Sequence, residues 1–246
     1  SRALTMLTGR RPDARLAKDT AARLKLLNNP GSLTDTGLDR HLLDRFDALV
    51  AGAPGRSMLA PELTPPLSHL RADDEAGSPA VAFAPGARWP AKQWPANKFH
   101  AAAQAVLESG HHVRIILGPN ERSWFETSPL ASLADRSGVT VTRDADLPAV
   151  ARLLASCRVT LCNDSGLLHL SEAVGTPVVA LFGPTVPAFG YAPLLPTSRL
   201  RSVELDCRPC SRTGSRTCHR GDLACLDNID VDDAVADVLA LLEATP

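Results

Sequence analysis

The chain has 246 residues, of which 44% are hydrophobic and 22% charged, and its formal net charge is −1. This length suits one large or two small globular domains, and the scattered basic residues argue against nucleic acid or an anionic membrane as the main partner. The longest apolar runs are only as long as strands, so no transmembrane segment is predicted. The N-terminus lacks the apolar region of a signal peptide, and a cytoplasmic protein is expected.

The first third of the chain has its own organisation. Helical periodicity runs over residues 13–27 and again over about 38–51, and residues 56–79 are rich in Pro, Ser and acidic groups without any periodicity. We interpret this stretch as two helices followed by a linker.

From Ala80 the pattern alternates strictly between strand and helix. The predicted strands are Ala80–Ala84, His112–Leu117, Val139–Thr142, Arg158–Cys162, Pro177–Phe182 and Leu200–Leu205. The predicted helices are Ala96–Ser109, Glu121–Arg136, Asp146–Ser156, Ser165–Val174 and a last one that Asp230 caps and that ends near Glu243. Buried strands alternating with helices predict an α/β fold with a parallel, doubly wound sheet.

The segment Asn163-Asp-Ser-Gly-Leu-Leu-His169 carries the strongest functional signal. Asp164, Ser165 and Gly166 fall where a strand ends and a helix begins, and His169 follows one helical turn later. Free backbone N–H groups and the helix dipole favour an anion at such a turn. A capping Asp or Ser is also common for structural reasons alone. The combination indicates a polar ligand that carries phosphate.

Two further loops follow strands and would share this edge of the sheet. In the loop Ala84–Pro95, Gly86 would let a ligand approach the backbone and Lys92 would supply positive charge. The alternative is a proline-rich loop with a solvated lysine. In Gly118-Pro-Asn-Glu121 the carboxylate of Glu121 is a candidate acceptor for ribose or base, or simply complements the helix dipole.

Two later loops add candidates. Thr185 in the turn-rich loop after Phe182 could touch a ligand. The spacing Cys207-Arg-Pro-Cys210, followed by Cys218 and Cys225, fits a four-thiolate site for structural zinc or iron. Disulfides are the alternative, although they are rare in cytoplasmic proteins. Cys157 and Cys162 are interpreted as packed thiols.

Together these segments resemble glycosyltransferase family 9, the ADP-heptose:lipopolysaccharide heptosyltransferases. The matching pieces are Pro85-Gly-Ala with Lys92-Gln-Trp-Pro95, Gly118–Glu121, Asn163–His169, Gly175–Thr185 and the cysteine cluster. Their order and spacing hold over residues 80–246, whereas residues 1–55 match more weakly. The resemblance implies a GT-B fold, with residues 1–78 as the remnant of an incomplete N-terminal, Rossmann-like acceptor domain plus linker. Residues 79–246 would form the C-terminal donor-binding domain.

The resemblance also implies roles for the candidate residues. Gly86, Ala87, Arg88 and Lys92, with Asp164, Ser165 and Gly166, would hold the diphosphate and sugar of the donor. Glu121 would contact the nucleoside, and His169 would lie near the phosphates. The implied partners are ADP-heptose or a similar nucleotide sugar and lipid A-Kdo or another glycolipid acceptor. Peripheral attachment at the inner membrane stays open.

The implied reaction is inverting transfer of heptose or a related sugar to the lipopolysaccharide core, without a catalytic divalent metal. The family's catalytic base is an Asp in a Gly-Asp loop near the first strand of the N-terminal domain, and no such loop precedes Asp13. We therefore expect this chain to bind donor without turnover. The alternatives are a non-catalytic nucleotide-sugar binding module and a nucleotide-sugar 2-epimerase. The base and sugar of the donor, and the oligomeric state, stay open.

Overall fold

The computed structural model describes residues 80–244 together with Leu27, Leu67 and Leu70. The helices and linker expected before Ala80 lie outside the described residues, apart from those three positions. The strands are β1 (Ala80–Ala84), β2 (His112–Ile116), β3 (Val139–Thr142), β4 (Val159–Asn163), β5 (Val178–Phe182) and β6 (Arg199–Ser202). The helices are α4 (Ala96–Glu108), α5 (Arg122–Thr127), α6 (Leu147–Ala155), α7 (Gly166–Ala173), α8 (Ala224–Asp227) and α9 (Val231–Ala244), with 3-10 turns η3 (Pro90–Lys92), η4 (Pro129–Leu133) and η5 (Pro187–Phe189).

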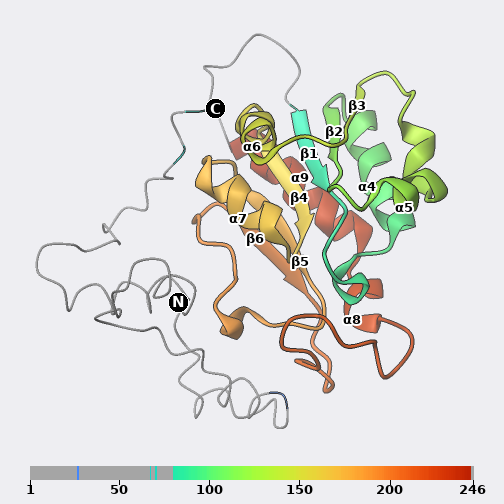
Figure 1. Cartoon of the computed structure of the whole chain (residues 1–246). Coiled ribbons are helices and arrows are strands. Elements are labelled where there is room, and N and C mark those ends of the chain that lie inside the picture. The colour runs from blue at the N-terminus through green and yellow to red at the C-terminus, as the bar shows by residue number, and fades with distance from the viewer. Residues whose placement is uncertain (1–26, 28–66, 68–69, 71–79, 245–246) are drawn as a thin grey trace, which may run out of the picture.

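The strands form one parallel sheet in the order β3-β2-β1-β4-β5-β6 (Figure 1). The chain builds outward from β1 to β3, then returns to pair β4 with β1, with Ala84 opposite Cys162. The connections after β1 and β4 therefore leave the sheet in opposite directions. Such a reversal leaves a crevice at the carboxyl ends of the strands, where α/β proteins bind ligands.

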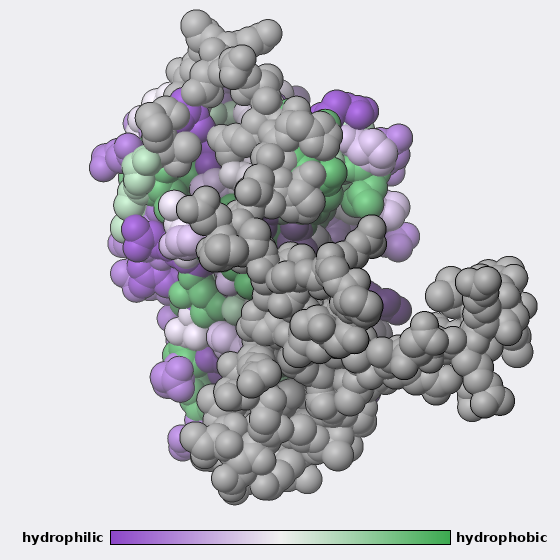
Figure 2. Space-filling view, turned by 90° about the vertical axis from the view of Figure 1, so that its left-hand side faces the viewer, coloured by the Kyte–Doolittle hydropathy of each residue, from purple (hydrophilic) through white to green (hydrophobic). Residues whose placement is uncertain are grey.

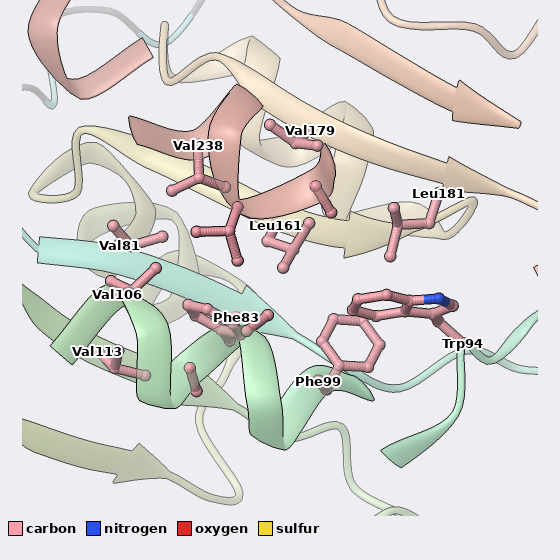
Figure 3. Packing of buried hydrophobic residues seen from close by; sticks show 14 of the residues in the cluster. Val81, Phe83, Trp94, Phe99, Val106, Val113, Leu161, Val179, Leu181 and Val238 are labelled. Atoms are coloured by element: carbon pink, nitrogen blue, oxygen red, sulfur yellow. The ribbon is translucent and has the colours of Figure 1, made fainter. Parts of the chain in front are cut away.

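Helices cover both faces of the sheet. On one face α4 and α9 pack against the central strands in the largest apolar cluster, where Phe99 lies edge-on to Trp94 with ring centroids 5.0 Å apart (Figure 3). On the other face α6 and α7 pack against β1, β4 and β5. Every residue of β1, β4 and β5 is buried, because both faces of these strands are covered. The expected α/β class is confirmed.

One predicted helix is wrong. The residues predicted as a single helix from Glu121 to Arg136 form α5 and the 3-10 turn η4, separated at Ser128. Ser128 is extended, with φ −92° and ψ 159°, and Pro129 follows it. Proline has no N–H to continue the helical ladder and forces the residue before it out of the helical region.

The region after β5 also differs from expectation. The last strand ends at Ser202 instead of Leu205, and the carbonyl of Val203 accepts a hydrogen bond from Arg208 Nη1. A short helix, α8, was not predicted. It places Cys225 and Leu226 in the main apolar cluster, so this segment contributes to the core.

The described residues show how polar and apolar side chains are distributed over one side of the surface. On the side shown in Figure 2, hydrophilic residues are interspersed with smaller hydrophobic areas over the described part. Among the described residues, no helix combines the length and the apolar character that crossing a bilayer requires.

Candidate functional site

A buried asparagine joins the two loops that diverge at the centre of the sheet. Asn163, the last residue of β4, is fully buried. Its Oδ1 accepts a hydrogen bond from the backbone N–H of Trp94 at 2.9 Å, and its Nδ2 donates to the carbonyl of Pro85 at 2.8 Å. The loop between β1 and α4 is therefore fixed to the end of β4, beside the start of α7.

This loop brings the predicted lysine and aspartate together. Lys92 Nζ lies 2.6 Å from Asp164 Oδ2, and the two side chains are only 14% and 8% exposed. The hydroxyl of Thr185 donates to the same carboxylate oxygen at 2.5 Å. Lys92 lies in η3, whose turn directs a lysine distant in sequence toward the start of α7.

A pocket of about 280 Å³ surrounds this ion pair. Its lining is formed by Arg88, Trp89, Lys92, Asp164, Ser165, Gly166, His169, Thr185, Tyr191, Arg212 and Thr213. Three basic side chains thus face one carboxylate, and the pocket lies at the N-terminus of α7. We call it the anion pocket, because this balance of charge and the helix dipole both favour a negatively charged ligand.

Ser165 stands at the N-cap of α7 without capping it. Its side chain makes no hydrogen bond to the helix, and its buried Oγ has no hydrogen-bond partner in the described part of the chain. A Cβ added to the next residue, Gly166, would meet nothing within 4 Å. Both residues line the pocket, where the backbone N–H groups and, after a rotation, the serine hydroxyl could donate to an anion.

A second, larger pocket of about 640 Å³ adjoins the first and shares Arg88, Ser165, Gly166 and His169 with it. The rest of its lining is mostly apolar and includes Ala87, Ile116, Leu117, Gly118, Glu121, Ala145, Leu147, Val150, Leu167 and Leu170. We call it the apolar pocket. A flat, largely apolar group of about the size of a nucleoside suits such a lining.

Glu121 and Gly86 meet in the wall of the apolar pocket. The Glu121 carboxylate accepts a hydrogen bond from Gly118 N at 2.8 Å. A Cβ on Gly86 would lie 1.9 Å from that carboxylate. The sequence suggested that Gly86 leaves room for a ligand, whereas the structure gives it the different role of leaving room for Glu121.

The remaining predicted residues line the same two pockets. His169 borders both and lies near Tyr191, with ring centroids 6.4 Å apart. Arg88 is exposed over the ring of Trp89 at 5.2 Å. Ala87 is buried, and its carbonyl accepts a hydrogen bond from Gln93 Nε2 at 2.9 Å. All nine residues predicted to bind the sugar donor therefore line one or both of these adjoining pockets.

The predicted four-cysteine metal site stays a prediction. In the described part of the chain, no group of three or more His, Cys, Asp or Glu side chains is arranged to hold a metal ion. All four thiols are free. Cys225 is held in α8 and packs into the main apolar cluster.

The thiols nevertheless lie close enough to affect one another. Burial, followed by the charges of Cys207 and Cys218, raises the pKa of Cys210. Burial raises the pKa of Cys225 to about 11. For Cys218 the effect of burial is outweighed by hydrogen bonds from three backbone groups of the loop, and its pKa is lowered.

Some lining residues were missed by sequence reasoning. Arg212 and Thr213 reach the anion pocket from the cysteine-rich loop, and Leu147 and Val150 reach the apolar pocket from α6. Arg212 carried a usable signal, since it is a basic residue within a loop already suspected of function. Leu147 and Val150 carried none, because they looked like ordinary residues of an amphipathic helix.

Comparison with known proteins identifies the family. The model of glycosyltransferase family 9 (heptosyltransferase) matches residues 1–219. The chain is 33% identical over 116 residues to lipooligosaccharide heptosyltransferase 2 of Haemophilus ducreyi, over 45% of this chain and 33% of that protein. The match thus covers about a third of the length of this relative and of lipopolysaccharide heptosyltransferase 2 of Escherichia coli.

Solved structures agree on the fold. The Escherichia coli ADP-heptose LPS heptosyltransferase II superposes with a TM-score of 0.62 at 22% identity, covering 83% of this chain and 62% of that chain. TibC from enterotoxigenic E. coli is a dodecameric iron-containing heptosyltransferase solved with ADP-D-beta-D-heptose. It superposes with a TM-score of 0.54 at 18% identity, covering 71% and 48%. Together with the family match, which fits the expected GT-B class, these findings assign the chain to glycosyltransferase family 9, the heptosyltransferase family.

Proposed function

We propose that residues 79–246 form the donor-binding domain of a heptosyltransferase that transfers heptose, or a related sugar, from an ADP-sugar to a lipopolysaccharide core acceptor. One observation carries this proposal: a charged pocket at the start of α7 adjoins an apolar pocket of nucleoside size. The diphosphate would occupy the anion pocket and the nucleoside the apolar pocket. The named relatives, which are lipooligosaccharide and lipopolysaccharide heptosyltransferases, support the choice of sugar and acceptor.

In this proposal Lys92 changes partner when the donor binds. In the structure its ammonium lies against Asp164. A donor phosphate would compete for the ammonium, and the freed carboxylate of Asp164 could then accept a hydrogen bond from a sugar hydroxyl. Ser165 Oγ and the first N–H groups of α7 would donate to the phosphate. Glu121 would accept from the ribose, and His169 would lie between the two halves of the ligand.

The chemistry follows from these contacts. The acceptor hydroxyl oxygen attacks the anomeric carbon from the face opposite the diphosphate, the bond between that carbon and the diphosphate oxygen breaks, and the configuration inverts. The electron pair stays on the leaving diphosphate, where Lys92 and the α7 N-terminus stabilise the developing charge. We assign the general base that takes the acceptor proton to a carboxylate outside residues 80–244.

The competing proposal is a nucleotide-sugar binding module without turnover. Calorimetry with ADP and ADP-heptose tests donor binding. Product analysis with a lipid A-Kdo acceptor then separates the two proposals. Binding with product supports the transferase, and binding without product supports the module. No binding of either ligand would contradict both.

The cysteine cluster completes the proposal as a structural zinc or iron site. The support is the donor set of four thiols, their mutual effect on pKa, and the iron described for TibC. Because the thiols do not converge in the structure, an ion would require the loop to close around it. Metal analysis and thiol alkylation test this. A bound ion protects all four thiols, whereas in metal-free protein Cys218 reacts before Cys225.

We also propose a cytoplasmic location, in which the protein meets the glycolipid acceptor at the inner membrane.

A further inference from the structure

The cysteine-rich loop, residues 207–223, is bound firmly to the end of β5. The side chain of Arg208 is buried and donates hydrogen bonds to the carbonyls of Gly183 at 2.6 Å and Thr185 at 3.0 Å. The backbone N–H of Cys210 donates to the carbonyl of Pro184 at 3.2 Å. The start of the loop is therefore tied to the same segment that presents Thr185 to Asp164.

From this anchor the loop turns back over the anion pocket. The buried hydroxyl of Ser211 accepts the N–H of Gly214 at 2.9 Å, which closes a tight turn. Arg212 and Thr213, inside the turn, line the anion pocket. In Figure 1 the loop between β6 and α8 lies along the lower edge, next to the loop between β1 and α4.

Gly214 lies against the side chain of Lys92. It is buried with φ +83°, and a Cβ on it would lie 2.4 Å from both Cγ and Cδ of Lys92. These atoms are the middle of the lysine side chain, and that side chain is 14% exposed. The backbone of the turn thus covers the methylene stem of Lys92 while its ammonium meets Asp164.

We propose that the cysteine-rich loop forms a wall of the anion pocket and takes part in ligand binding. In this proposal Arg212 binds the donor diphosphate, and Gly214 is a positioning residue for Lys92. This inference rests on the proposed function, because it assigns further residues to the same site. The charge of the pocket supports it. With Arg212 included, three cations face one carboxylate, a net charge that suits a diphosphate.

Two matched pairs of variants of the 246-residue chain test the two assignments. Gly214→Ala is paired with Gly221→Ala, which lies in the same loop at φ +80° but whose added Cβ meets nothing within 4 Å. Both variants carry the strain of a side chain at positive φ, and only the first displaces Lys92. Arg212→Ala is paired with Arg216→Ala, an exposed arginine of the same loop that does not line the anion pocket.

The readout is calorimetric affinity for ADP and for adenosine. We expect Gly214→Ala to weaken ADP binding about tenfold and Arg212→Ala about fivefold, while the paired controls stay within about twofold. Adenosine affinity should not change in any of the four. In a Lys92→Ala background, Gly214→Ala should have no further effect on ADP, because it acts through the lysine.

Equal ADP affinities within a matched pair would overturn the assignment that the pair tests. An undiminished effect of Gly214→Ala in the Lys92→Ala background would also overturn the positioning role. If Gly214→Ala does not fold, the arginine pair, which changes only exposed side chains, decides whether the loop takes part in ligand binding. The proposed function fails separately: it fails if Lys92→Ala itself leaves ADP affinity unchanged.

Discussion

The two pockets at the carboxyl edge of the sheet share four lining residues but differ in size and in the chemistry of the remaining lining. The anion pocket is small and is lined by three basic side chains, a carboxylate and hydroxyls, whereas the apolar pocket is more than twice as large and is lined mainly by aliphatic side chains. The difference indicates a division of labour. One half of a ligand would be recognised by charge and the other by shape, with Ser165, Gly166 and His169 at the boundary.

The largest effect that would separate the pockets is expected from Lys92→Ala. Removing the ammonium leaves the nearly buried Asp164 carboxylate without its cation and repelling phosphate, so ADP affinity should fall about 100-fold. Adenosine affinity should stay within about twofold. Lys98→Ala is the matched control, since Lys98 Nζ binds the carbonyls of Asp227 and Ile229 and does not line either pocket. Equal losses for ADP and adenosine would contradict the division of labour.

Gly86→Ala should weaken binding in the apolar pocket, which Gly86 lines. The added Cβ cannot coexist with the Glu121 carboxylate, so the glutamate must move, and binding of ADP and adenosine should weaken alike by about tenfold. Titrations with both ligands measure this. A Glu121→Ala background provides the control, because it removes the clash and should abolish the effect of Gly86→Ala. An effect confined to ADP would assign this wall to phosphate instead.

Ser165→Ala should weaken ADP binding about fivefold and leave the affinity for adenosine unchanged. Its second readout is stability. Replacing a capping serine with alanine typically costs about 1 kcal/mol, but Ser165 does not cap α7, so the free energy of unfolding should hardly change. Ser109→Ala, which removes a hydroxyl that donates to the carbonyl of Val106 far from the pockets, controls for the loss of a hydroxyl. A clear loss of stability in Ser165→Ala would point to a structural serine.

The smallest effect is expected from Leu147→Ala. Leu147 is 66% exposed at the rim of the apolar pocket, so truncation should lower the affinity for adenosine and for ADP by only about twofold to threefold. Pyrophosphate, which lacks the nucleoside, should bind the variant and the parent chain equally. A loss of pyrophosphate binding would show that the two pockets are not separable.

The sequence predicted the strands best, because covering both faces of a parallel sheet leaves long uninterrupted apolar runs such as Ala80–Ala84. It also predicted that Lys92, Glu121 and Asp164 would share one edge, since strand ends in a parallel sheet meet there. It could not predict their distances. The 3-10 turn that aims Lys92 at Asp164, and the space that Gly86 leaves for Glu121, depend on contacts between loops far apart in the chain.

The misplaced helix has a local cause. Apolar periodicity continued through Pro129, so two short elements looked like one helix. The four-cysteine metal site stays a prediction, because spacing alone contains no information about the core in which α8 holds Cys225.

The buried amide of Asn163 has a consequence for how the site meets its ligand. With one oxygen and one nitrogen it ties the end of β4 to two points of the loop that carries Lys92. The lysine loop and the start of α7 therefore cannot drift apart, and little conformational freedom is left for a ligand to remove on arrival. This junction of the two loops is therefore preorganised.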